Sequence, residues 1–259
     1  MSLPESLDLS NNELVTFVGA GGKKTAIHKL LSSDQPGHTF PMLYTTTTKM
    51  PPPQDIPLRI RDKQQLNTQL SDWNSTIAIA SGEVSDPSRV PKKFTGYSPD
   101  VIDSIFSGQE RGWVLVKGDG ARQREIKAPG QNEPQIPKKS TIVVPVISVQ
   151  VVGSPLSKGL AHRVEQIEYC TSLSRGDDIA AEDLGQLIAH KNGGCKSVPP
   201  TAEIIPMVNK ADNSELEQAG KEVLLAAANR SKRISAGIIC SLKNGYVSKY
   251  QQLSSSSTG

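Results

Sequence analysis

Short apolar runs alternate with polar, glycine-rich segments along most of the chain. Runs of this length are typical of buried strands in a parallel sheet, and segments with a helical spacing of apolar residues follow several of them. We expect strands over residues 13–18, 42–45, 76–80, 113–116, 141–147, 204–208 and 234–240. We expect helices over residues 24–33, 62–72, 98–106 and 216–228, and a mostly helical segment over 154–189. This alternation predicts an α/β protein with a mostly parallel sheet flanked by helices.

Prolines and polar segments set the limits of this pattern. Pro145 predicts a bulge, an edge position or the end of its strand, and Pro206 weakens the strand that contains it. Residues 1–12 predict a loose lead-in, and the serine-rich residues 251–259 predict a disordered tail. Because no clean linker or internal repeat interrupts the rest, we expect a single α/β domain over residues 1–250.

Composition and charge exclude several classes of partner. A net charge of +3 and an aromatic content of 4% favour neither a nucleic-acid surface nor a base-stacking platform. No apolar run approaches the roughly 20 residues of a membrane-spanning helix, and the first residues lack the basic and apolar regions of a signal peptide. The three cysteines are odd in number and far apart, which indicates reduced thiols. We therefore expect a cytoplasmic protein that binds neither nucleic acid nor a membrane.

Candidate chemistry begins where the first predicted strand ends. Gly19, Gly21 and Gly22 follow this strand, and Lys23 and a predicted helix come next. Glycines let backbone N–H groups turn toward an anion, a helix N-terminus adds partial positive charge, and a lysine neutralises the outer phosphates. The segment therefore predicts a phosphate-binding loop.

This loop departs from the strict P-loop pattern G-x-x-x-x-G-K-[ST]. Phe17 stands where the first glycine belongs, and Lys24 stands where the metal-binding hydroxyl belongs. Thr25 supplies a hydroxyl one place later. A glycine-rich turn with exposed lysines is the alternative interpretation of the same residues.

Asp119 follows the predicted strand 113–116 after two intervening residues. In P-loop enzymes an aspartate at such a place holds Mg²⁺, which keeps hard oxygen ligands. We therefore expect Asp119, with Thr25 as a second candidate ligand, to hold Mg²⁺ beside a nucleotide, and Lys23 and Asp119 to act in catalysis. A simple Asp-Gly turn is the alternative. The basic residues after Asp119, Lys127 among them, fit phosphate contacts or a solvated loop equally well.

Residues 209–212 read Asn-Lys-Ala-Asp and fit N-K-x-D, the guanine-reading loop of GTPases. The Asp212 carboxylate would accept hydrogen bonds from guanine N1 and N2. The Asn209 amide would serve the acceptor edge of the base, and the stem of Lys210 would lie along the ring. Adenine lacks that pair of donors, so the loop favours GTP while ATP stays open. A helix N-cap formed by Asp212 is the alternative.

These loops are expected to meet in space. The carboxyl ends of parallel strands lie at one edge of a sheet, and ligands bind beyond that edge. Thr47, Thr48 and Lys49 follow a further predicted strand and would form a hydroxyl-rich loop near phosphate or Mg²⁺. Some GTPases order such a loop through the γ-phosphate. A β-branched strand end is the alternative.

Seven segments, in this order, resemble the YqeC-type family of selenium-dependent hydroxylase accessory proteins. They are VGAGGKKT (18–25), TTTTKM (45–50), GDGARQREIKAP (118–129), NEPQIP (132–137), SPLSKGLAHRVE (154–165), AHKNGGCKSVPP (189–200) and NKAD (209–212). The resemblance implies a P-loop NTPase-like fold that binds a nucleotide, and by association a role in maturing molybdenum-containing hydroxylases.

The resemblance also implies roles by matching position. Residues 19–23 would form the phosphate loop with Thr25 near it, residues 47–49 a second loop, Asp119 the acidic residue on the metal side and residues 209–212 the loop at the base. Two residues depart from the family pattern. Lys24 stands where a threonine or serine is usual, which weakens Mg²⁺ binding unless Thr25 takes over. Lys117 stands where an acidic residue is usual, and this would cost catalysis while leaving nucleotide binding intact.

Three functions fit these observations. The first is a slow GTPase or ATPase that assists a molybdenum hydroxylase or its maturation machinery. The second is a non-catalytic nucleotide-binding scaffold on the same fold, which Lys24 and Lys117 favour. The third is a small-molecule kinase or nucleotidyl transferase, which needs an acceptor pocket.

Overall fold

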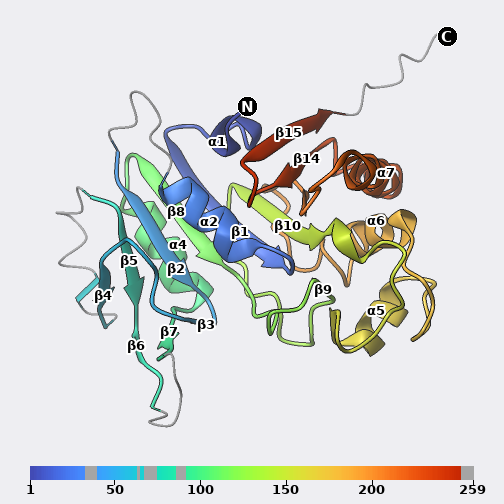
Figure 1. Ribbon diagram of the computed structural model, residues 1–259. Helices are drawn as coiled ribbons and strands as arrows, with labels where there is room; N and C mark the ends of the chain where they lie inside the picture. Colours follow the sequence, from blue (N-terminus) through green and yellow to red (C-terminus); the bar gives the residue numbers. More distant parts are fainter. Residues whose placement is uncertain (33–39, 63–64, 67–74, 86–91, 252–259) are drawn as a thin grey trace.

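The computed structural model describes residues 1–32, 40–62, 65–66, 75–85 and 92–251. Its centre is a ten-stranded sheet in the order β15-β14-β13-β10-β1-β8-β2-β5-β4, and β12 also pairs with β10 (Figure 1). The described pairings in this sheet are parallel except that of β14 with β15. The strands are β1 (Asn12–Gly19), β2 (Met42–Thr46), β4 (Leu58–Ile60), β5 (Ile77–Ala80), β8 (Gly112–Lys117), β10 (Ile142–Ser148), β12 (Glu203–Ile204), β13 (Met207–Asn209), β14 (Ala236–Ser241) and β15 (Tyr246–Gln251).

Helices cover both faces of this sheet (Figure 1). They are α1 (Leu3–Ser6), α2 (Lys23–Leu31), α4 (Pro99–Ser107), α5 (Val164–Cys170), α6 (Ala181–Ala189) and α7 (Ser214–Arg230), with a short 3-10 helix η1 (Val149–Val151) after β10. Alternate side chains of β1 point to opposite faces of the sheet and so join different helical layers. Val15 and Phe17 pack with α1 and α2, whereas Leu14 packs with α4 and Val18 joins the core under α6 and α7. The predicted α/β class and the three-layer arrangement are confirmed.

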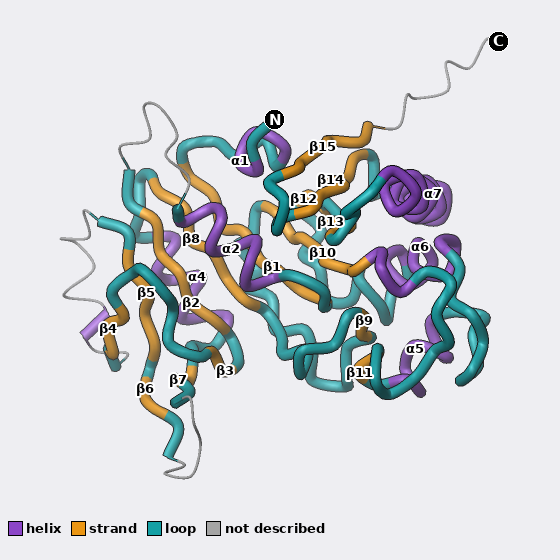
Figure 2. The backbone as a smooth tube through the Cα atoms, viewed as in Figure 1, coloured by secondary structure: helices purple, strands orange, loops and turns teal. Residues whose placement is uncertain are grey.

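Two small sheets flank the carboxyl edge of the central sheet (Figure 2). One contains β3 (Lys49–Met50), β7 (Phe94–Thr95) and β6 (Gly82–Glu83), all antiparallel. The other pairs β9 (Ile126–Lys127) with β11 (Ala161–His162) in parallel. Both small sheets therefore lie beside the loops that leave β1, β2 and β8.

The prediction of a loose N-terminal lead-in is wrong. Residues 3–6 form a helical turn with a capping box, in which Ser2 and Glu5 exchange hydrogen bonds with each other's backbone. Leu3 and Leu7 are buried against α2 and the sheet. Leu3 and Leu7 have a helical spacing, but a pattern of only two residues cannot be distinguished from chance.

The prediction of a mostly helical segment over residues 154–189 is also wrong. Only α5 and α6 are helical there, and β11 and irregular loops fill the remainder. His162, expected on a helix, lies in β11, and Arg163 begins α5 in the left-handed conformation with φ of 64°. Apolar residues of these loops, such as Leu156 and Ile179, are buried against the helices. The spacing of apolar residues in the sequence reflects this burial and was mistaken for that of a helix.

Pro145 lies in the middle of β10, a central strand, without ending it. The Val143 carbonyl accepts from Ile205 N–H on one side, and the Val146 carbonyl accepts from Ala20 N–H on the other. Because backbone groups alternate sides along a strand, Pro145 faces the side where Pro206 separates β12 from β13. Proline has no N–H, so Pro145 cannot donate a hydrogen bond to the neighbouring strand. That strand is interrupted at the same level, at Pro206, where a weak strand was expected.

The remaining predicted elements are found close to their expected bounds, with two exceptions. The helix predicted over 62–72 lies mostly outside the described residues. The serine-rich tail was expected from residue 251, yet Gln251 ends β15, and residues 252–259 lie outside the described part of the chain. No helix in the described ranges combines the length and apolarity that crossing a bilayer requires.

Candidate functional site

The loop between β1 and α2 holds three glycines in conformations that other residues rarely adopt. Gly19, Gly21 and Gly22 have φ of 88°, 83° and 148°. A Cβ on Gly21 would lie 2.6 Å from Ser148 N, and one on Gly22 would lie 2.2 Å from Asn209 Nδ2. The glycines are therefore needed both for positive φ and for the close approach of the loop to β10 and β13.

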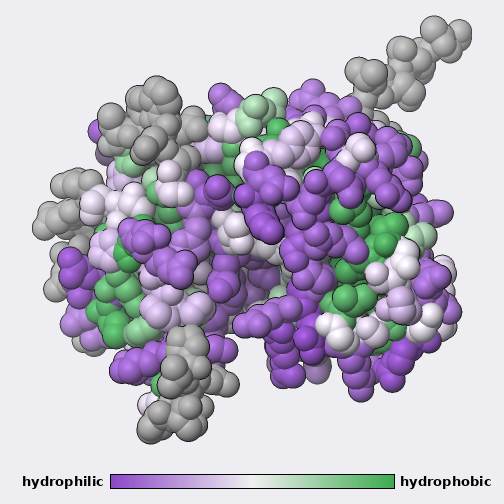
Figure 3. Space-filling model, in the orientation of Figure 1, coloured by the Kyte–Doolittle hydropathy of each residue, from purple (hydrophilic) through white to green (hydrophobic). Residues whose placement is uncertain are grey.

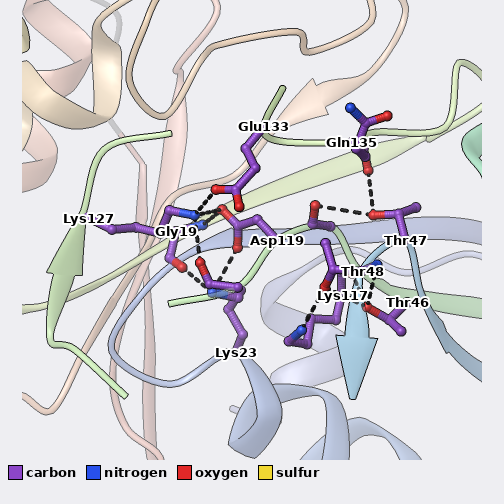
Figure 4. Close-up of polar contacts among 12 residues, drawn as sticks. Gly19, Lys23, Thr46, Thr47, Thr48, Lys117, Asp119, Lys127, Glu133 and Gln135 are labelled. Carbon is purple, nitrogen blue, oxygen red and sulfur yellow. Dashed lines mark hydrogen bonds and ion pairs between the residues drawn. The ribbon is translucent and has the colours of Figure 1, made fainter. Parts of the chain in front are cut away.

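Lys23, the first residue of α2, turns back under this loop and is 5% exposed (Figure 4). Its Nζ donates to the Gly19 carbonyl and forms an ion pair with Asp119 Oδ1 at 2.9 Å. Burial lowers the pKa of Lys23, and the negative charge of Asp119 opposes that shift. The loop lysine and the strand-end aspartate, predicted independently, are thus in direct contact.

Asp119 follows β8, the strand next to β1, and is 1% exposed. Besides the ion pair with Lys23, its Oδ2 accepts from Gly19 N–H at 3.0 Å and pairs with Lys127 Nζ at 2.9 Å. Oδ2 thus meets an N–H group and an ammonium group, whereas Oδ1 lies beside the Lys23 ammonium without a hydrogen bond from the described residues. The aspartate joins the glycine loop to the segment after β8.

Lys127 and Glu133 extend this ion network. Lys127 Nζ lies 2.6 Å from Glu133 Oε2 and 2.7 Å from the Gly120 carbonyl. Glu133 also pairs with Arg163 Nη1 at 2.7 Å. Burial raises the pKa of Glu133, but hydrogen bonds from Arg163 and Lys127 outweigh it and lower that pKa to about 2.

Sequence reasoning missed the roles of Glu133 and Arg163 in this network. The two side chains meet across 30 residues of sequence, through a loop and β11. The sequence singles out Lys127, as a phosphate contact or a solvated residue. No local sequence pattern identifies Glu133 or Arg163 as ion-pair partners. Only the closeness of Lys127 to Asp119 in the sequence gives a signal for this network.

The threonine-rich loop after β2 lies on the other side of Asp119 (Figure 4). The Thr47 hydroxyl lies 2.9 Å from the Gln135 carbonyl and 3.2 Å from the Gly118 carbonyl, beside Asp119, and its one proton is shared between these two acceptors. Thr48 Oγ1 accepts from Lys117 Nζ at 3.0 Å. The structure therefore brings Thr47 and Thr48 to the same edge as the glycine loop, while Lys49 is exposed and contributes its carbonyl to Lys117 at 2.7 Å.

Lys117 is the last residue of β8 and is 8% exposed. Burial lowers its pKa to about 8, and the positive charge of Lys23 contributes to that shift. By comparison with the family pattern, Lys117 stands in place of a carboxylate. The structure shows instead a third buried lysine at the site.

The Asn-Lys-Ala-Asp loop follows β13, which is separated from β1 by β10 alone. Asn209 Nδ2 donates to the Gly21 carbonyl at 2.8 Å, and its Oδ1 accepts from Leu242 N–H at 3.2 Å. Lys210 pairs with Glu125 at 2.7 Å. Asp212 is exposed, and it accepts from Ser241 Oγ at 2.5 Å and from Gln150 Nε2 at 2.8 Å.

The N-cap of α7 is Asn213 and not Asp212, because the Asn213 side chain accepts from Leu216 N–H. The helix-cap alternative for Asp212 is therefore wrong. Asn209 contacts the glycine loop directly, which joins the third loop to the site. A base that contacted Asp212 would share this carboxylate with Ser241 and Gln150.

Two sequence-predicted residues stay apart from this cluster. Lys24 and Thr25 are exposed on α2, and no contact in the described chain joins the Thr25 hydroxyl to Asp119. No group of three or more His, Cys, Asp or Glu residues that could hold a metal ion occurs in the described ranges. The donor set therefore does not fit a dedicated Mg²⁺ site, because Asp119 is already engaged by two ammonium groups.

The molecular surface is hollowed at this edge (Figure 3). The hollow lies between the part that carries β3, β6 and β7 and the part that carries β9 and α5, and hydrophilic residues surround it. A polar ligand would have access to the loops after β1, β2 and β8 from this side.

Comparison with known proteins places these residues in a family. A family model described as "YqeC protein" matches residues 15–165, which include the glycine loop, Asp119, Glu133 and Arg163. The chain is also similar to "Uncharacterized protein YqeC" of Escherichia coli (strain K12), with 27% identity over 212 residues that cover 82% of this chain and 81% of that protein. The resemblance inferred from the seven sequence segments is thereby confirmed, and the chain belongs to the YqeC family.

Proposed function

We propose that this protein binds a nucleoside triphosphate, with the phosphates on the glycine loop between β1 and α2. The observation that carries the proposal is the buried pair of Lys23 and Asp119, which joins that loop to the end of the adjacent strand β8. A buried lysine at a helix start, below glycines with positive φ, is suited to an anion that approaches through backbone N–H groups. Phosphate would then compete with Asp119 for the Lys23 ammonium.

The nucleoside would extend from the glycine loop toward β13. Two strand spacings, about 10 Å, separate β1 from β13, and this suits a ligand whose phosphates and base lie at opposite ends. One hydrogen of the Asn209 amide is used by Gly21, and the second is left for a base acceptor. Asp212 would accept from guanine after its contact with Gln150 is broken, so GTP is preferred to ATP in this proposal.

Hydrolysis, if it accompanies binding, is proposed to be slow. Lys23 would stabilise charge that develops on the phosphate oxygens, and Asp119 would hold Lys23 and the Gly19 N–H in place. The carboxylates of this network, Asp119 and Glu133, are both held by cations and are poor candidates for a base that activates water. No step of this proposal passes through Mg²⁺, because Asp119 is already held by Lys23 and Lys127 and no described contact joins it to Thr25, the second metal ligand expected from the sequence.

The proposed partner is a molybdenum-containing hydroxylase or its maturation machinery. This part of the proposal rests on the family resemblance alone. Co-purification of the protein with such an enzyme from cells, and loss of active hydroxylase when the protein is deleted, would support it. Full hydroxylase activity in the deletion strain would contradict it.

Calorimetric titration with GTP and with ATP tests the nucleotide proposal. Wild-type protein, Lys23→Met and Asp212→Ala should be compared, each checked for folding by circular dichroism. We expect GTP binding that Lys23→Met abolishes and that Asp212→Ala reduces to the level of ATP. If neither nucleotide binds, the proposal is wrong. Assays for free phosphate and for a phosphorylated acceptor then distinguish an NTPase from a scaffold or a kinase.

A further inference from the structure

Three buried lysines gather around one aspartate at the proposed phosphate site. Lys23, Lys117 and Lys127 are the lysines below 9% exposure among the described residues, and they come from α2, β8 and β9. Burial of an ammonium group is costly unless a counter-charge or ligand compensates it. The position of all three at one sheet edge therefore calls for a compensating anion.

The donors of the three lysines are used to different extents. Lys127 contacts Asp119, Glu133 and the Gly120 carbonyl, which matches the three donors of an ammonium group. Lys23 and Lys117 each have two contacts with described residues: Gly19 and Asp119 for Lys23, and Thr48 and the Lys49 carbonyl for Lys117. Each of these two lysines thus keeps one donor for a ligand.

The fixed charges of the site are positive in sum. Lys23, Lys117, Lys127 and Arg163 face the two carboxylates of Asp119 and Glu133. A magnesium ion at Asp119 would meet two ammonium groups already on that carboxylate and the charge of Lys117, which interacts electrostatically with Lys23 and Asp119. Such an ion would be repelled strongly where water is excluded, whereas a polyphosphate would be attracted.

Resting on the nucleotide binding proposed above, we propose that this site takes the metal-free polyphosphate of the nucleotide, and that Lys117 replaces Mg²⁺ as the second cation on the outer phosphates. Lys23 approaches the phosphates from the glycine loop, and Lys117 approaches them from the threonine-rich loop. Lys127 acts through Asp119 as a positioning residue. The substrate class is therefore a nucleoside di- or triphosphate without its metal.

Titration calorimetry with GTP, ATP and inorganic tripolyphosphate, each in EDTA and in excess Mg²⁺, tests this inference. Wild-type protein should bind in EDTA, and excess Mg²⁺ should weaken binding by about tenfold or more, because the metal neutralises the ligand. This comparison needs no variant. Binding that requires Mg²⁺ would overturn the inference and leave the proposed function standing, whereas no binding in either condition would overturn both.

Two substitutions at one position sharpen the test. Lys117→Met should weaken binding in EDTA by about tenfold or more. Lys117→Glu adds a carboxylate beside Asp119 and should bind the nucleotide only with Mg²⁺. Lys29→Met, on the exposed surface of α2, is the matched control and should bind as the wild type does. Unchanged binding by folded Lys117→Met in EDTA, or binding by Lys117→Glu in EDTA, would contradict the role given to Lys117.

Discussion

Asp119 compensates two buried ammonium groups at once, so the residues of this network depend on one another. Removing one member of a buried ion pair leaves an uncompensated charge in a medium of low dielectric. Lys127 is the clearest case, because its side chain is fully buried and contacts Asp119, Glu133 and the Gly120 carbonyl. We expect its role to be one of stability and positioning.

Lys127→Met is therefore expected to lower the free energy of unfolding by about 3–5 kcal/mol. The matched control is Lys210→Met, which breaks a pair with Glu125 in which the side chains are 33% and 28% exposed, and it should cost at most about 1 kcal/mol. Urea denaturation followed by circular dichroism measures both. Equal losses in the two variants would contradict the description of Lys127 as the buried centre of the network.

Glu133 gives the network a signature in acid. Its pKa is lowered from 4.5 to about 2 in the folded protein by Arg163 and Lys127. A carboxylate with a depressed pKa stabilises the folded state above its unfolded pKa, and this contribution is lost as the pH falls through the folded value. Wild-type protein should thus lose stability between roughly pH 5 and pH 2 in part through this residue.

Glu133→Gln is expected to flatten that part of the stability curve while lowering stability at pH 7. Melting temperatures measured at several values between pH 7 and pH 2.5, roughly the span of this titration, report the difference. Glu110→Gln, at an exposed carboxylate, should run parallel to the wild type. If Glu133→Gln also runs parallel, Glu133 does not hold its ion pairs in solution.

At the scale of elements, the glycine loop acts as a junction of β1, β10 and β13. Gly21 has φ of 83°, and its Cβ would meet Ser148 N at 2.6 Å and the Glu125 carbonyl at 2.8 Å. Its own carbonyl accepts from Asn209. Backbone atoms of Ser148 and Glu125 thus enclose Gly21 on two sides. The Ser148 backbone cannot move away without a shift of β10.

Gly21→Ala should therefore destabilise the protein by about 1–3 kcal/mol, through positive φ and backbone contact. Gly120→Ala is the matched control from the neighbouring loop, since nothing lies within 4 Å of a Cβ there. We expect that variant to stay within about 0.5 kcal/mol of the wild type. Thermal melts of the two variants decide the matter, and equal melting temperatures would show that the loop adapts.

The elements themselves differed in how far sequence predicted them. β1, β8 and α7 were expected because each has a short continuous apolar run or a sustained helical spacing. The convergence of Lys23, Asp119 and Asn209 followed from parallel strands, which bring their carboxyl ends to one edge. The ion pairs of Glu133 and the place of Pro145 in a central strand depend on partners far along the chain, and no local pattern carries them.

At the scale of the whole molecule, the site connects elements from both halves of the sheet. Thr47, after β2, contacts Gly118, which precedes Asp119. Asn209, at the end of β13, contacts Gly21 in the glycine loop. A ligand that replaces the contacts around Lys23 would therefore act on loops that leave β1, β2, β8 and β13. Such a ligand binds the folded state and not the unfolded chain, so it must raise stability.

The proposed nucleotide is expected to raise the melting temperature in proportion to its binding. At one hundred times its dissociation constant it adds about 2.7 kcal/mol, which corresponds to roughly 5–10 °C for a chain of this size. Amide hydrogen exchange should show the accompanying protection in residues 19–25, 117–120 and 209–212, and little change in β15, the strand at the outer edge of the sheet. Lys23→Met removes the central ligand contact, so both the temperature shift and the local protection should disappear while β15 exchanges as before. Protection spread evenly over the sheet would instead mean that the nucleotide binds elsewhere or acts only as a general anion.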